Sequence, residues 1–193
     1  MFDMDVQFLF DMASQTILVN DKEQKAIITN PQMSENEERY LHTMDCVTLG
    51  HIVTLDNEKF LVVSETVTKR HSKYKAKIRH CNYTIEFAGE VIEDYLRDEN
   101  GNIVYDRFGE PILITIEGDS IFIPSIVKNK TFSIAGSQLL VAENQIIVIV
   151  QESEVNKEKF KVNNTFNLMD YNWKVRNQDR TKKGLLILTC ERV

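Results

Sequence analysis

Short runs of β-branched and aliphatic residues recur about every 8 to 12 residues along the chain, with turn residues between them. Strand signals at this spacing are typical of all-β sandwiches and barrels. Asn20-Asp21 and Asp56-Asn57 each separate two such runs, and Asn100-Gly101 is the strongest type of short hairpin signal. Glu143-Asn144 predicts a further turn, and the acidic run 34–38 predicts a loop. We therefore predict an all-β fold, a small β-barrel or sandwich built from hairpins.

The first dozen residues depart from this strand pattern. Their apolar side chains recur at helical intervals, at Val6, Leu9, Phe10 and Ala13. This spacing predicts one short helix at the N-terminus, ahead of the strands.

An aromatic strand, a basic loop and a strand that ends in cysteine occur twice, ending at Cys81 and at Cys190. The pattern is that of ordinary hairpins with solvated turns, or of two related β modules. We predict an N-terminal helix and hairpin arm over 1–45, a β module over 46–88, a hairpin-rich middle region over 89–125, and a second β module over 126–193. A single domain containing all four segments is the alternative.

Composition bounds the class of protein without naming a function. The chain has 193 residues, 42% hydrophobic and 27% charged, which is typical of a folded domain. The N-terminus lacks the basic region of a signal peptide, and no apolar run approaches the roughly 20 residues of a membrane span. Three widely spaced cysteines favour reduced thiols over a disulfide framework. We expect a soluble intracellular protein with no membrane contact.

The sequence contains no recognisable enzyme motif for phosphate binding, zinc-dependent hydrolysis or a serine nucleophile. His80 and Cys81 resemble a base and a nucleophile, but neighbouring residues on a strand point to opposite faces. We therefore predict that the protein is not an enzyme and that it has no catalytic residue, metal site or cofactor.

The segment 69–80 carries six basic residues and no acidic one. On a strand, Lys73, Lys75, Lys77 and Arg79 share one face. The net charge of the whole chain is −6, so everything outside this segment sums to −12. Such a face is a solvated surface, a dock for an acidic partner or sister subunit, or a phosphate-binding surface. The candidate basic patch, including a second basic loop, comprises Lys69, Arg70, Lys73, Lys75, Lys77, Arg79, Arg180, Lys182 and Lys183.

Three polar, turn-rich segments between strands are candidate functional loops, because loops carry binding residues more often than strands do. They are 69–73, 94–111 and 176–183.

Several segments, in order, resemble a structural protein from the neck region of tailed bacteriophages that infect Gram-positive bacteria. They are Gly-His-Ile-Val at 50–53, Lys-Phe-Leu-Val-Val at 59–63, Arg-His-Cys-Asn-Tyr-Thr-Ile at 79–85, Gly-Asn-Ile at 101–103, Ile-Pro-Ser-Ile-Val at 123–127, Trp-Lys-Val at 173–175, Asp-Arg-Thr at 179–181 and Lys-Gly-Leu-Leu-Ile-Leu-Thr-Cys at 183–190. Members of this family often have Asp where this chain has His51.

The resemblance implies a head–tail connector or head-closure stopper: a β-rich subunit that forms a ring between portal and tail. Expected partners are copies of itself, the portal, adaptor and tail proteins, and packaged DNA in passing, without sequence-specific binding. The expected location is the virion, assembled in the bacterial cytoplasm. The alternatives are another virion role (tail terminator, baseplate or capsid decoration) and a nucleic-acid-binding β-barrel that uses the strand 69–80.

Overall fold

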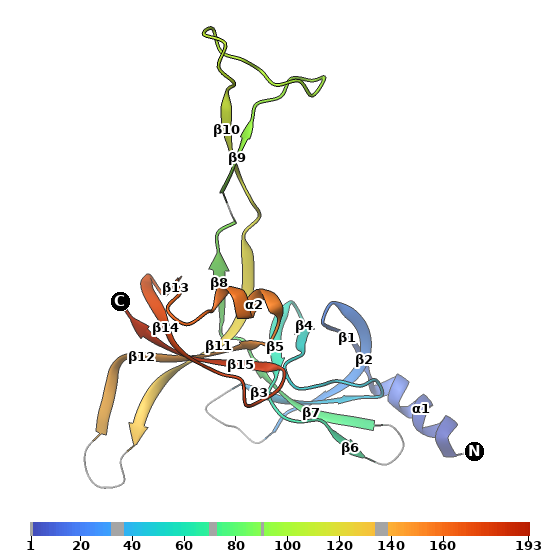
Figure 1. Ribbon diagram of the computed structural model, residues 1–193. Coiled ribbons are helices and arrows are strands. Elements are labelled where there is room, and N and C mark those ends of the chain that lie inside the picture. The colour runs from blue at the N-terminus through green and yellow to red at the C-terminus, as the bar shows by residue number, and fades with distance from the viewer. Residues whose placement is uncertain (1, 32–36, 70–72, 90, 134–138) are drawn as a thin grey trace. The chain divides into compact units, whose positions relative to one another are not determined.

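The computed structural model describes residues 2–31, 37–69, 73–89, 91–133 and 139–193 (Figure 1). Most of the described residues lie in strands and few lie in helices, which confirms the predicted all-β fold. The predicted N-terminal helix is present as α1 (Phe2–Ala13). The chain divides into two compact units, residues 1–85 with 123–193 and residues 86–122, which are described separately below.

The first sheet of the larger unit closes into a small barrel. Its strand order is β3-β2-β1-β4-β5-β7-β6, and β3 pairs with β7 as well as with β2, which joins the two sides of the sheet. The closing pair is antiparallel, with Glu38 opposite Arg79 and Thr43 opposite Tyr74. The strands are β1 (Gln15–Val19), β2 (Lys22–Thr29), β3 (Glu38–Thr43), β4 (Ile52–Leu55), β5 (Glu58–Val62), β6 (Val67–Lys69) and β7 (Lys73–His80).

The barrel core follows from the two-residue period of its strands. On β7, Ala76 and Ile78 point inward and are buried, together with Leu41 from β3 and Phe60 from β5. Fully burying a Leu, Ile or Phe side chain contributes about 1.5–3 kcal/mol. The alternate residues of β7 therefore face outward, and this outward face carries its basic side chains.

Two hairpins of the barrel are those predicted from the sequence. Asn20 and Asp21 have φ angles of 46° and 63°, and Asp56 and Asn57 have φ angles of 51° and 66°. Positive φ at both central residues is the conformation of a type I′ hairpin turn, and Asn and Asp tolerate it best after glycine. The turn residues thus fix the register of β1 with β2 and of β4 with β5.

The second sheet of the larger unit has six strands in the order β13-β14-β15-β12-β11-β8. Val148 and Val150 on β12 and Leu186 and Leu188 on β15 are buried. The single tryptophan, Trp173, is also buried, and its indole N–H donates to the Leu168 carbonyl over 3.0 Å. The strands are β8 (Tyr83–Phe87), β11 (Ile121–Ser133), β12 (Leu139–Gln151), β13 (Thr165–Leu168), β14 (Tyr171–Asp179) and β15 (Leu185–Arg192).

A small apolar cluster joins the barrel to the second sheet. Leu61 of the barrel packs with Ile126 and Leu185 of the second sheet, and all three are buried. Asn82 adds two hydrogen bonds to β11: its side-chain N–H donates to the Val127 carbonyl over 3.0 Å, and the Val127 N–H donates to its side-chain oxygen over 2.8 Å. Polar and apolar contacts together therefore hold the two sheets as one unit.

The two sheets also approach at a pair of glycines. Gly50 and Gly184 both have positive φ angles, 86° and 97°. A Cβ atom on Gly184 would lie 2.2 Å from the Leu49 carbonyl oxygen, and one on Gly50 would lie 1.8 Å from the Gly184 carbonyl oxygen. Only glycine fits at either position, because both the backbone conformation and the close approach exclude a side chain.

Two features of the second sheet differ from the sequence prediction. A short helix, α2 (Glu154–Lys159), lies where no helix was expected; Ser153 caps it by accepting a hydrogen bond from the Asn156 N–H over 3.1 Å. The turn expected at Glu143-Asn144 is wrong, because β12 runs through it. Asn144 has a φ of 83° and lies in a register shift between β11 and β12, so the positive-φ residue forms a bulge instead of a turn.

The smaller unit, residues 86–122, is a long β-hairpin. Its stem pairs β9 (Val91–Tyr95) with β10 (Leu113–Glu117), and this two-stranded sheet contains no further strand. At the far end of the stem are two short arms, closed by bridges between Arg97 and Ile103 and between Tyr105 and Pro111. An isolated two-stranded hairpin is marginally stable in water, so this unit needs additional contacts.

Those contacts come in part from a three-way junction at the end of the stem. Leu96 donates its N–H to the Ile112 carbonyl, Ile112 donates to the Val104 carbonyl, and Val104 donates to the Leu96 carbonyl, over 2.8, 3.0 and 2.8 Å. Their side chains are half-buried. The stem and the two arms therefore meet in a closed triangle of backbone hydrogen bonds.

The two arms are built alike. In the first, the Asp98 carboxylate accepts hydrogen bonds from the N–H groups two and four residues later; in the second, Asp106 does the same. Gly101 and Gly109 occupy the same place in each arm, with φ angles of 81° and 82°. The pKa of Asp98 is lowered, mainly because the Asn102 backbone N–H stabilises the charged form.

Candidate functional site

The basic face of β7 lies on the outside of the barrel, beside β3. Glu38 on β3 lies opposite Arg79 and is within 3.1 Å of the Lys77 ammonium. The Arg79 Nε donates to the same carboxylate over 2.9 Å, with a second, shorter contact from its guanidinium. Burial raises the pKa of Glu38, but the hydrogen bonds from Arg79 and Lys77 outweigh it, and the net shift is downward. The Glu38 carboxylate thus forms ion pairs with two of the basic side chains of β7.

The other end of this face carries Lys73 and Lys75. The Lys75 ammonium lies over the Tyr40 ring at 4.1 Å from its centroid, a cation–π contact that leaves the positive charge in place. Within the described residues, neither Lys73 nor Lys75 has an acidic partner. Among the described residues, the basic face therefore pairs with an acid at Lys77 and Arg79 and has no acidic partner at Lys73 and Lys75.

An apolar pocket opens beside the unpaired end of the basic face. Its volume is about 250 Å³, and its wall is formed by α1 and by strands β2, β3 and β7. Phe10 and Ile27 supply apolar surface, while Lys73 and Lys75 lie at the same pocket. The remaining lining residues are Thr29, His42, Thr43 and Tyr74.

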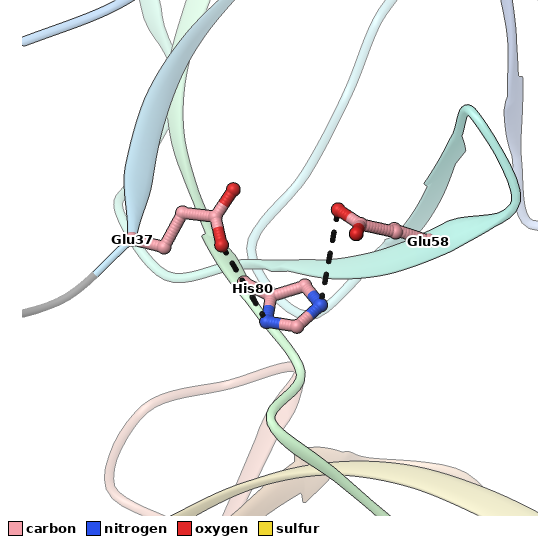
Figure 2. A group of neighbouring side chains, drawn as sticks. All are labelled: Glu37, Glu58 and His80. Carbon is pink, nitrogen blue, oxygen red and sulfur yellow. Dashed lines mark ion pairs between the residues drawn. The ribbon is translucent and has the colours of Figure 1, made fainter.

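Figure 2 shows a second polar group, the imidazole of His80 between the carboxylates of Glu37 and Glu58. The Nδ1 atom lies 3.8 Å from Glu37 and the Nε2 atom lies 4.0 Å from Glu58. One ligand atom from each of the three side chains lies within 4.8 Å of the other two, a spacing at which the group could hold a metal ion. It would supply one imidazole nitrogen and two exposed carboxylates, fewer ligands than the four of a structural zinc site. The group ties β5 and the residue before β3 to the end of β7.

The second basic loop belongs to the other sheet, between β14 and β15. Lys182 and Lys183 are exposed, and Arg180 donates to the Gln178 side-chain oxygen over 2.7 Å. The structure thus places these residues on a different sheet from the β7 cations. Arg70 and the side chain of Lys69 lie outside the part of the chain that the structure describes, as does most of the predicted loop 69–73.

The hairpin unit accounts for the net negative charge of the protein. Residues 86–122 include ten acidic residues and two arginines, a net charge of −8, whereas the whole chain is −6; the rest of the chain is therefore slightly basic. The acidic residues of the unit are Glu86, Glu90, Glu93, Asp94, Asp98, Glu99, Asp106, Glu110, Glu117 and Asp119.

The same hairpin unit exposes large apolar side chains. Phe108 at the tip of the second arm is 77% exposed, and Val91 and Leu113 on the stem are 63% and 59% exposed. Large apolar side chains exposed in number on one segment make that segment a candidate interaction site. The sequence pointed to the loop 94–111 by its polar turns; it did not show these side chains as exposed, because their alternation resembles that of any half-buried strand.

The three thiols differ in accessibility. Burial raises the pKa of Cys81 and of Cys190 to about 12, whereas Cys46 is exposed. The His80 ring faces Glu37 and Glu58 and packs against Phe60 at 5.3 Å between ring centroids. A protonated Cys81 thiol would be a poor nucleophile.

These features define an all-β protein in which a barrel and a second sheet form one unit and a separate acidic hairpin forms another. Residues 1–80 match the model of the YomX N-terminal domain, and residues 97–191 match that of the YomX C-terminal domain. The chain belongs to the YomX family, which is phage-derived.

The other comparisons add no relative. No curated protein and no solved structure matches the chain. The described helices include none that is long and apolar enough to span a membrane.

Proposed function

We propose that the protein is a structural component of a tailed-phage virion that forms a ring in the neck, between portal and tail. In this role it closes the DNA-filled head, joins the tail, or does both. Its partners are copies of itself and the portal, adaptor and tail proteins. The phage-derived family and the order of the neck-like sequence segments support this role.

The observation that carries the proposal is the hairpin unit 86–122. It combines a net charge of −8 with exposed apolar side chains on a two-stranded sheet that is marginally stable alone. A charged surface keeps such a segment soluble before assembly, and its apolar side chains provide the free energy of association. These are the properties of an assembly arm, which a structural subunit needs and a monomeric catalyst does not.

The charge distribution favours passing contact with DNA over binding. Two of the β7 cations already share Glu38, so fewer are available for phosphates than the sequence suggests. The salt-dependent affinity of a protein for DNA scales with the number of phosphates that it neutralises. This observation disfavours the alternative of a nucleic-acid-binding barrel that uses β7. An acidic hairpin repels phosphates and would let DNA move past it.

A mechanical role also accounts for the thiols. With a pKa of about 12, Cys81 is protonated at neutral pH, and His80 is occupied by two carboxylates and an aromatic ring. The proposed role is therefore mechanical and includes no catalytic step.

An amber mutation in the gene tests the proposed role in an infected culture. Without the protein, we expect heads that package DNA and then lose it, together with free, complete tails. Antibody labelling of wild-type particles should place the protein at the neck. Overlong tails would indicate a tail terminator instead. Tailed particles that fail to adsorb to host cells would indicate a baseplate subunit. Either result, or wild-type particles that lack the protein, would refute the neck role.

A further inference from the structure

The second arm of the hairpin unit presents one aromatic ring on a rigid turn. Phe108 is 77% exposed, and Asp106 fixes the turn by accepting hydrogen bonds from the Phe108 and Glu110 N–H groups over 2.8 and 2.9 Å. Arg107 stacks on the ring at 4.9 Å from its centroid. A rigid aromatic at the end of a turn loses little entropy on binding, which suits it to anchor an interface.

The pocket beside β7 has the size and chemistry to receive such a ring. Its volume is about 250 Å³, and an apolar cavity of roughly 150 Å³ already holds a benzene molecule. Phe10, Ile27 and Tyr74 offer apolar and aromatic surface for edge or face contacts with a phenyl group.

Apart from Arg107, which stacks on the Phe108 ring, the charges around the two surfaces are opposite. Lys73 and Lys75 lie at the pocket without an acidic partner among the described residues. Phe108 is followed two residues later by the exposed Glu110, on a unit of net charge −8. Opposite potentials across a contact steer association and exclude wrong partners.

We propose that the hairpin unit of one copy docks on the barrel of a second copy, with Phe108 in the pocket between α1 and β7 and Glu110 beside Lys73. The chain carries both complementary surfaces, so a second copy is sufficient as the partner. A contact between different surfaces of identical subunits is heterologous and closes into a ring when the rotation allows it. Only the closing of the contacts into a ring depends on the proposed neck function. The contact itself is inferred from the two complementary surfaces.

The first experiment measures self-association of the full chain by sedimentation velocity across protein and salt concentrations. We expect the wild type to associate, more weakly at high salt, and Phe108→Ala to weaken association by at least about tenfold. Tyr171→Ala is the control, because Tyr171 is an exposed aromatic of the second sheet. Association that Phe108→Ala leaves unchanged, or a wild type that stays monomeric, overturns the proposed contact.

The second experiment identifies the partner surface by a disulfide between two differently tagged chains, both carrying Cys46→Ser. One chain carries Phe108→Cys and the other Ile27→Cys; mild oxidation should cross-link the two chains. A chain with both substitutions that cross-links only within itself would refute docking on a second copy. If the chains cross-link but the protein is absent from virions, the contact stands and the neck function fails. If virions contain the protein at the neck but no cross-link forms, the contact fails and the function stands.

Discussion

Replacing Gly184 with alanine should uncouple the barrel from the second sheet. The new Cβ would lie 2.2 Å from the Leu49 carbonyl oxygen, about 1 Å closer than real contacts allow, so one backbone segment must move. The φ of 97° adds strain, about 1–2 kcal/mol for an L-residue in the left-handed region. Overpacking adds about 1–3 kcal/mol, which gives a total loss of about 3 kcal/mol.

Urea unfolding followed by the fluorescence of Trp173 measures this loss, because the single tryptophan is buried in the second sheet. Asn57→Ala is the matched control: Asn57 also has positive φ and lies in the same unit, but it is exposed in a turn. The free energy of unfolding of Asn57→Ala should fall by about 1 kcal/mol, from backbone strain alone. If Gly184→Ala costs no more than Asn57→Ala, the close approach of the two sheets is wrong.

Three further predictions concern the barrel and its junction. Glu38→Gln should lower the free energy of unfolding by about 2 kcal/mol at pH 7, as measured by urea titration. Because the pKa of Glu38 is lowered from 4.5, the difference from wild type should shrink as the pH falls below that value, which urea titrations at several pH values would show. Asn82→Ala should cost about 2 kcal/mol, since it leaves the buried Val127 N–H and carbonyl without their partner. A maleimide should label Cys46 in the native protein and both other thiols only after unfolding, as counted by mass spectrometry.

Each of these has a result that would contradict it. A Glu38→Gln difference that grows at acid pH would mean that the carboxylate is not stabilised in its charged form. An Asn82→Ala variant as stable as wild type would show that water replaces both hydrogen bonds. Rapid labelling of Cys81 in the native protein would reopen the question of a reactive thiol.

The parts of the fold that could be predicted depend on local signals. Asn20-Asp21 and Asp56-Asn57 specify their turns through backbone conformations that few other residues tolerate, so both hairpins were predictable. The outward face of β7 followed from strand alternation. Asn144 shows the limit of such signals. A residue with positive φ occurs in β-bulges as well as in turns, and the pairing of β12 with β11 determines which of the two forms.

The site depended on contacts between distant segments, which a single sequence does not specify. Glu38 lies in a stretch that was expected to be a loop, and only the closing of β3 on β7 places it beside Lys77 and Arg79. The pocket is formed by residues of α1, β2, β3 and β7, which are brought together only by the fold. The helix α2 had a usable signal in the Ser153 cap, but its six residues are too few to show a clear period.

The triangle of Leu96, Val104 and Ile112 gives the hairpin unit a modular tip. These residues are eight positions apart, and each arm leaves the triangle and returns to it without altering the stem register. An arm can therefore be lengthened, exchanged or used to graft a foreign epitope while the stem stays intact. Among members of the YomX family, this tip is the place where insertions and exchanged segments would be tolerated best.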